Sequence, residues 1–130
     1  MSGSPMTSRH VLPFPPSVNR YWRHVAIGRS VRAITSEAGR DYRKTVVALL
    51  DGAVKYTNKP RLAITMWVYP PDRRRRDLDN LPKAVLDAIE AAGVVVDDSQ
   101  FDELHVVRCG VVEGGRIVVE IKKLTFGEDE

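Results

Sequence analysis

The sequence predicts one α/β domain built on a mixed sheet of about four strands, with helices packed on it. A length of 130 residues and a hydrophobic content of 43% suit one domain with a substantial core. Segments rich in β-branched residues occur alongside two segments of helical periodicity, with no internal repeat or linker between them. We expect the domain to span residues 11–125, between a flexible N-terminal tail, residues 1–10, and an acidic C-terminal tail, residues 126–130.

The first half of the chain contains one expected strand and one expected helix. Residues 10–14 suit a short strand that Pro15-Pro16 ends. Residues 17–35 are basic and show no pattern that assigns them. From Ser36, a suitable N-cap, apolar residues recur at helical spacing until Asp51-Gly52 ends the pattern.

The second half begins with a strand and the clearest helix of the chain. Residues 61–69 alternate and are rich in β-branched and aromatic side chains, which predicts a strand. Residues 79–92 place apolar side chains on one helical face, with Asp79 or Asn80 as the cap and Gly93 as the stop.

Two further strands are expected near the C-terminus. Leu104–Val112 and Arg116–Leu124 are both rich in β-formers, and Glu113-Gly114-Gly115 separates them. This break predicts that the two strands form an antiparallel hairpin. Cys109 lies in the first strand and is expected to be a small buried residue.

Charge and composition exclude some classes of protein. The formal net charge of +3 averages an arginine-rich centre with an acidic end, so it identifies no partner by itself. A single cysteine rules out an intramolecular disulfide, and the N-terminus lacks the apolar region of a secretory signal. No apolar run is long enough to span a bilayer. We therefore expect a cytoplasmic protein.

One strand-helix-turn unit contains three aspartates and a lysine. Asp77 and Asp79 flank Leu78, and residues i and i+2 of an extended segment point to the same side. Lys83 follows Asp79 by four residues, which places the two on one helical face. Asp98 follows the helix, where the chain returns. We expect the three carboxylates and the ammonium to meet in one small hollow open to solvent.

Three converging carboxylates need protons or a cation. At about 4 Å each pair repels by about 4 kcal/mol when the effective dielectric is near 20. Oxygen ligands without a nearby histidine or cysteine suit Mg²⁺ or Mn²⁺ and disfavour zinc. Such an ion supports phosphodiester hydrolysis. Lys83 would stay protonated and steady the phosphate or the leaving group.

Each part of this unit also has a purely structural interpretation. Asp-x-Asp-Asn before a helix is often only a turn and a cap, and Asp97-Asp98-Ser99 can be the same. Lys83 on an exposed helix face is usually solvated, or it pairs with Asp87. The combination of acids, lysine and adjacent arginines favours the functional interpretation. It leaves open whether Asp97 shares the role of Asp98.

Two basic stretches are candidates for DNA binding. The first is a run of four residues, Arg73, Arg74, Arg75 and Arg76. Such a run repels itself unless a polyanion neutralises it, and the guanidinium group suits bidentate phosphate contacts. Asn19 and Arg20 belong to the second stretch, in which Trp22 either stacks on a base or, as we expect, is buried in the core.

Three stretches resemble the RusA-type endodeoxyribonucleases, or Holliday junction resolvases: PPSVNRYW at 15–22, RRDLDNLPKAVLDAI at 75–89 and GVVVDDSQFDEL at 93–104. The likeness covers residues 11–123. It implies a RusA-like fold and a homodimer that uses Mg²⁺ or Mn²⁺ to nick four-way DNA junctions symmetrically, in recombination, repair or phage DNA processing. It also implies that the essential aspartates correspond to Asp77, Asp79 and Asp98, and the essential lysine to Lys83.

The sequence leaves two other functions open. In a non-catalytic module that binds junctions or branched DNA, the aspartates would only cap and solubilise. A metal-dependent hydrolase of small phosphate esters would show weak salt dependence and no preference for branched DNA. The long arginine run also leaves open whether the protein selects junctions or binds branched DNA in general.

Overall fold

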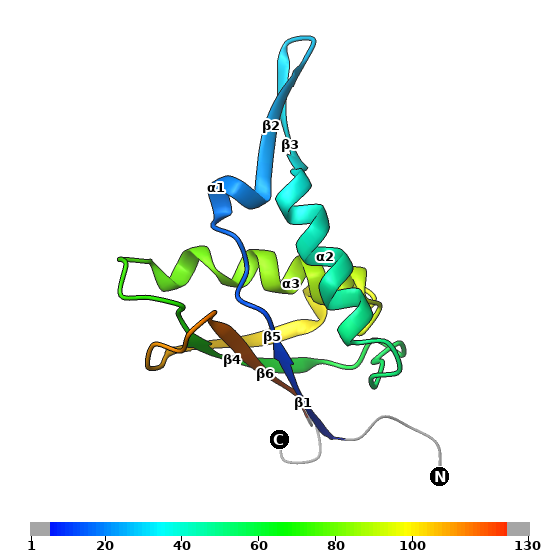
Figure 1. The fold of residues 1–130 in the computed structure, drawn as a ribbon. Helices are drawn as coiled ribbons and strands as arrows, with labels where there is room; N and C mark the ends of the chain where they lie inside the picture. The colour runs from blue at the N-terminus through cyan, green and yellow to red at the C-terminus, as the bar shows by residue number, and fades with distance from the viewer. Residues whose placement is uncertain (1–5, 125–130) are drawn as a thin grey trace.

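The computed structural model describes residues 6–124, and it confirms the expected α/β class. Figure 1 shows helices covering one face of a four-stranded sheet, with a separate two-stranded hairpin projecting from the helical layer. The helices and strands are β1 Thr7–Leu12, α1 Val18–Tyr21, β2 Trp22–Ile27, β3 Ser30–Thr35, α2 Glu37–Leu49, β4 Leu62–Tyr69, α3 Pro82–Ala91, β5 Phe101–Arg108 and β6 Arg116–Lys123. Among residues 6–124, no helix is long and apolar enough to cross a membrane.

The sheet has the strand order β1-β6-β4-β5, in which β4 and β5 are parallel and the other pairs are antiparallel. The expected hairpin of the last two strands is therefore wrong, because β4 lies between them. The connection crosses the end of β4, where Val68 O accepts from Cys109 N–H at 2.7 Å and Pro70 O accepts from Val112 N–H at 2.9 Å. Cys109 consequently lies half-buried in this connection, after β5 has ended at Arg108.

The first strand begins earlier than expected. β1 starts at Thr7, which pairs with Lys122 of β6, and it ends at Leu12 rather than Phe14. Strand pairing thus includes part of the segment assigned to the N-terminal tail. The domain limits and both tails stay predictions, since residues 1–5 and 125–130 lie outside the described residues.

The two long helices form where the apolar periodicity predicts them, but only α2 begins with a side-chain cap. Ser36 caps α2 as expected, because its Oγ accepts from Gly39 N–H at 3.1 Å. Neither Asp79 nor Asn80 caps α3. Residues 78–80 form a 3₁₀ turn, Leu81 takes the cap position without a side-chain bond, and α3 begins at Pro82. Pro is well suited to this first position because it has no N–H to satisfy.

The core lies between the sheet and the helices α2 and α3. Its α3 side is formed by four side chains that are at most 1% exposed: Ala84, Val85, Ala88 and Ile89. Residues 17–35, which sequence reasoning left unassigned, form α1 and the β2–β3 hairpin, with a turn at Gly28 (φ +61°). Trp22, at the start of β2, is only half-buried rather than part of the buried core.

Candidate functional site

The sequence-predicted site residues divide between the two ends of α3. Asp77 and Asp79 precede the helix, Lys83 lies in its first turn, and all three are exposed. Asp98 belongs to a second 3₁₀ turn, Asp98–Gln100, beyond the other end of the helix. There its N–H donates to Oε1 of Glu90 at 3.3 Å.

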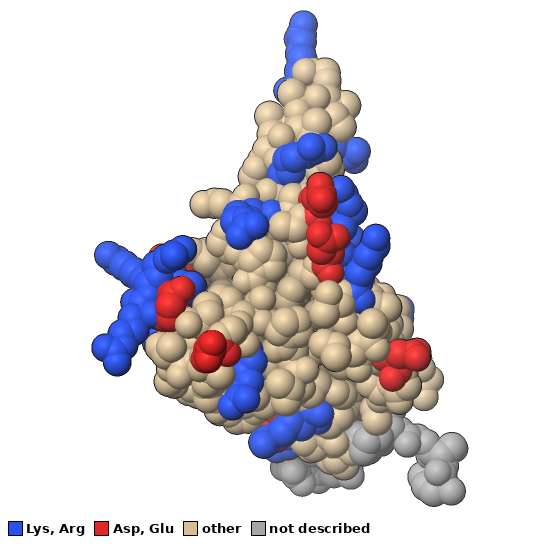
Figure 2. Space-filling model, viewed as in Figure 1, with Lys and Arg blue, Asp and Glu red and all other residues tan. Residues whose placement is uncertain are grey.

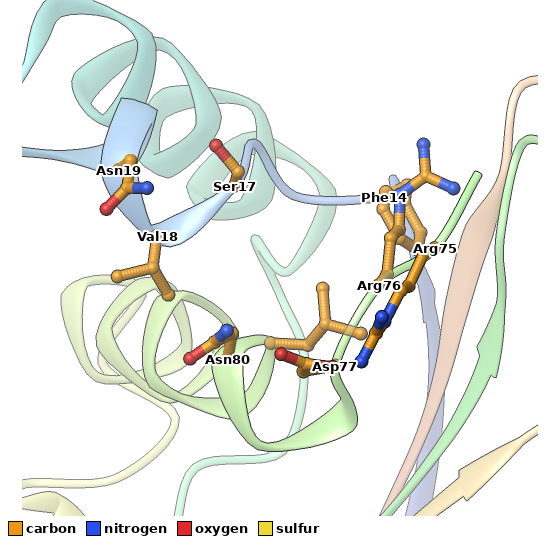
Figure 3. A pocket seen from close by; sticks show the side chains of 9 residues that line it. Phe14, Ser17, Val18, Asn19, Arg75, Arg76, Asp77 and Asn80 are labelled. Carbon is orange, nitrogen blue, oxygen red and sulfur yellow. The ribbon is translucent and has the colours of Figure 1, made fainter.

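The two aspartates before α3 face different hollows. Asp77 is extended (φ −89°, ψ 133°), but the chain winds into the 3₁₀ turn directly afterwards, so the strand alternation that would align Asp77 with Asp79 is lost. Asp77 lines a cavity of about 390 Å³ with Asn80 and Arg75, and Figure 3 shows Asn19 approaching it from the α1 side.

Asp79 lines a separate groove of about 560 Å³ between α3 and β5. Lys83 and Asp98 also line this groove, whose remaining walls are apolar: Leu78, Pro82, Leu86, Leu104 and Val106. The structure thus brings Asp79 and Lys83 together on one helical face, as the i, i+4 spacing predicted. Asp98 borders the same groove, at its far end.

The length of α3 separates Asp79 from Asp98. Asp98 is tied to Glu90, eleven residues after Asp79 (90 − 79), and a helix rises about 1.5 Å per residue. Asp79 and Asp98 therefore line the shared groove from opposite ends of α3. Of the expected set, Asp79, Lys83 and Asp98 line one groove, whereas Asp77 lines a different cavity, and the shared metal site stays a prediction.

A different group of acids lies close together at the end of α3. The carboxylates of Glu90, Asp97 and Asp98 approach within 4.8 Å of one another, and all three residues are exposed. Burial, followed by the neighbouring Asp97, raises the pKa of Asp98. Sequence reasoning missed Glu90. Its available signal was position, because the chain reverses at Gly93, three residues after Glu90, and brings Asp97 and Asp98 back past it.

These donors fit a hard divalent cation in kind. The acids at both ends of α3 offer carboxylate oxygens, and no histidine or cysteine lines the groove. Burial and, after it, the neighbouring Asp97 raise the pKa of Asp98, and a bound cation would oppose both effects by favouring the ionised carboxylate. The fit is one of donor chemistry, with Asp79 and Asp98 in one groove and Asp77 in a neighbouring cavity.

Lys83 lies against an aromatic ring. Its Nζ is 4.9 Å from the ring centroid of Trp22, within cation–π distance. This contact joins the first turn of α3 to the base of the β2–β3 hairpin. Lys83 is exposed and takes part in no ion pair recorded for residues 6–124.

The four consecutive arginines are not equivalent. Arg76 pairs with Asp72 at 2.8 Å, lies over the Phe14 ring at 5.3 Å, and its side chain is 20% exposed. The bond from Arg76 lowers the pKa of Asp72 to about 2. Arg76 therefore shapes the loop, whereas Arg73, Arg74 and Arg75 are exposed to solvent.

Asn19 and Arg20 are both exposed on the α1 segment. Asn19 lines the cavity that contains Asp77, while Arg20 lines a different surface hollow together with Asp41. Of these two residues, it is Asn19 that borders the cavity next to the start of α3.

An α/β domain with carboxylates and a lysine in one groove, next to exposed arginines, has the chemistry of a nuclease. The chain belongs to the family described as Endodeoxyribonuclease RusA, whose model matches residues 13–122. The resemblance noted from the sequence is confirmed.

Curated relatives match over nearly the whole chain. It is 42% identical over 115 residues to the crossover junction endodeoxyribonuclease of Enterobacteria phage HK97, covering 88% of this chain and 92% of the relative. It is 40% identical over 121 residues to the enzyme of the same name from Enterobacteria phage 82, covering 92% of this chain and 98% of the relative. The protein of the same name from Escherichia coli K12 is 42% identical over 115 residues, covering 87% of this chain and 92% of the relative.

Proposed function

We propose that this protein is a metal-dependent endonuclease that resolves four-way DNA junctions. The observation that carries the proposal is membership of the RusA family over residues 13–122, which include the acids, the lysine and the arginine loop. The relatives named above are crossover junction endodeoxyribonucleases. A substrate of cellular or phage DNA would place the protein in the bacterial cytoplasm.

The proposed metal ligands are Asp77, Asp79 and Asp98, and the ion is Mg²⁺ or Mn²⁺. Bound there, the ion would supply Lewis-acid polarisation of the phosphate and activation of water. Lys83 holds the scissile phosphate or the leaving oxygen electrostatically, since it shares the face of Asp79 and is free to approach a strand in the groove.

Asp79 and Asp98 line opposite ends of one groove, and we propose that a second copy of the chain completes the set of acids at each end. The core-facing side chains of α3 are at most 1% exposed, so the helix cannot bend to bring its two ends together. We therefore propose a homodimer in which Asp98 of one chain approaches Asp79 of the other. The apolar groove walls support this contact, because Leu104 on the edge strand β5 is 47% exposed. A two-fold assembly also presents two equivalent sites to the two strands of a junction.

DNA contacts are assigned to Arg73, Arg74, Arg75, Asn19 and Arg20, all of them exposed. Arg76 was expected to join them. It stays a proposed contact, although its pairing with Asp72 and its contact with Phe14 also hold the loop in place.

One assay tests the proposal. A labelled four-way junction and a matched linear duplex are incubated with the protein in Mg²⁺, Mn²⁺ or EDTA. We expect paired symmetric nicks in the junction alone, and none in EDTA. Binding without cleavage under all ionic conditions would indicate a non-catalytic module. Hydrolysis of small phosphate esters, with the junction left intact, would assign the protein to another class of hydrolase.

A further inference from the structure

The β2–β3 hairpin projects from the body of the molecule (Figure 1). We call residues 22–35 the arm. Most of its side chains are exposed, including Val31 at 70% and Ile27 at 51%. An isolated two-stranded hairpin is only marginally stable in water. An arm as exposed as this one therefore suits a surface that a partner covers.

The charge of the arm indicates the partner. No acidic residue occurs before Glu37, whereas Arg20, Arg23, Arg29 and Arg32 lie in or next to the arm. Among residues 6–124, no recorded ion pair uses any of these arginines. Figure 2 shows basic side chains at the tip of the projection and around its base. A polyanion would neutralise them.

The register gathers two of these arginines on one face of the arm. Arg23 pairs with Ile34 and Val25 pairs with Arg32, and directly opposed residues of an antiparallel pair point to the same side. Alternation along each strand completes this face, which consists of Arg23, Val25, Ile27, Ser30, Arg32 and Ile34. It combines two cations with exposed aliphatic side chains.

The base of the arm is fixed to the helical layer. Tyr21, which directly precedes the arm, is fully buried, and its hydroxyl donates to the carboxylate of Asp87 on α3. Its carbonyl accepts from Ser36 N–H at 2.9 Å. A Cβ on Gly39 of α2 would lie 2.5 Å from the same carbonyl, so glycine allows this close approach. The arm therefore projects from a rigid base.

We propose that the arm binds duplex DNA beside the junction, with the face that carries Arg23 and Arg32 laid against a groove. The proposal rests on the function proposed above. A two-stranded ribbon fits the major groove of B-DNA, arginine forms bidentate contacts with phosphates, and aliphatic side chains can pack against bases. A second copy of the chain is the poorer occupant, because a two-fold contact would set these arginines against their own copies.

The position of the arm relative to the groove suits this role. Its first residue, Trp22, lies against Lys83, so the arm rises from the end of α3 that carries Asp79. DNA held by the arm would pass that end of the groove. The arm thus supplies affinity next to the place where the proposed chemistry occurs.

The test compares the double variant Arg23→Ala/Arg32→Ala with a control, Lys44→Ala/Lys122→Ala, which removes two exposed charges outside the arm. Junction and linear-duplex affinities are measured in EDTA between 50 and 200 mM salt. If the double alanine variant loses two phosphate contacts, the magnitude of its slope of log K against log salt falls by about 1.8. The ratio of wild-type to variant affinity then decreases about twelvefold between 50 and 200 mM salt. Arg23→Lys/Arg32→Lys restores most of the slope.

Each result has a distinct meaning. A wild-type slope for the folded arm variant, checked by circular dichroism, overturns the inference. So does a loss of dimer in sedimentation with no change in slope, which would assign the arm to a second copy. Failure of the proposed function is read separately, from wild-type protein that binds the junction in EDTA and leaves it uncut in Mg²⁺.

Discussion

The separation of the acids along α3 predicts that two inactive variants restore activity when mixed. Asp79→Asn removes an acid at one end of the helix and Asp98→Asn removes one at the other. If each site joins opposite ends of two chains, every site in either pure variant lacks one acid. A dimer with one chain of each kind has one site with both acids and one site with neither.

The size of the recovery follows from counting. Random exchange between equal amounts of the two variants gives about half mixed dimers, so about a quarter of all sites are complete. We therefore expect about a quarter of the wild-type rate of single nicking. Paired cuts of one junction should disappear, because the second site of each mixed dimer lacks both acids.

The assay follows a labelled junction in Mg²⁺ after the variants have been unfolded and refolded together, with native mass spectrometry to confirm mixed dimers. The matched control mixes Asp79→Asn with Lys83→Ala. These residues share one end of α3, so each mixed-dimer site stays damaged and no recovery is expected. Mixed Asp79 and Asp98 dimers that stay as inactive as their components would refute the shared site.

Three further predictions concern single residues. Gly39→Ala should lower the free energy of unfolding by about 1–3 kcal/mol, because its Cβ would meet Tyr21 O at 2.5 Å; Gly110→Ala, with nothing within 4 Å, is the thermal-melting control. The pKa of Asp98 is raised in the folded state, so ionising this carboxyl destabilises the fold. The destabilisation develops as the pH rises from the pKa of Asp98 in the unfolded chain to its higher pKa in the folded chain. Asp98→Asn should therefore melt higher than wild type near neutral pH in EDTA, and the gap should close below about pH 4; a constant gap would contradict this. Lys83→Met should lower the cleavage rate about 10²–10³-fold with junction affinity in EDTA nearly unchanged, and equal losses of both would make it a binding residue.

The elements predicted correctly are those that local sequence determines. Ser36 and the apolar spacing after it specify α2, and the apolar alternation of residues 61–69 specifies β4. Strand partners depend on distant segments, so the break at residues 113–115 was interpreted as a tight turn although it crosses the end of β4. The arm escaped assignment because it has no buried face to produce an apolar-polar alternation.

The site shows the same division. The i, i+4 spacing placed Asp79 and Lys83 on one face correctly, because a helix fixes that geometry locally. Asp77 is itself extended, but the 3₁₀ turn that follows it places Asp79 in a different hollow, so the role of Asp77 stays a prediction. The position of Asp98 depends on topology. Because β5 runs parallel to β4, its start lies at the far end of α3, and no local pattern reveals this.

Electrostatics separates binding from cleavage in this molecule. Carboxylates in the groove repel a phosphate backbone, so affinity has to come from the cations around it. The exposed arginines of residues 73–75 and those of the arm lie towards the end of α3 that carries Asp79, whereas Asp98 is bound to Glu90 near the other end. In the proposed assembly, a single chain would hold DNA without completing either site. Cleavage would then be confined to the dimer, where both strands of a junction meet complete sites together.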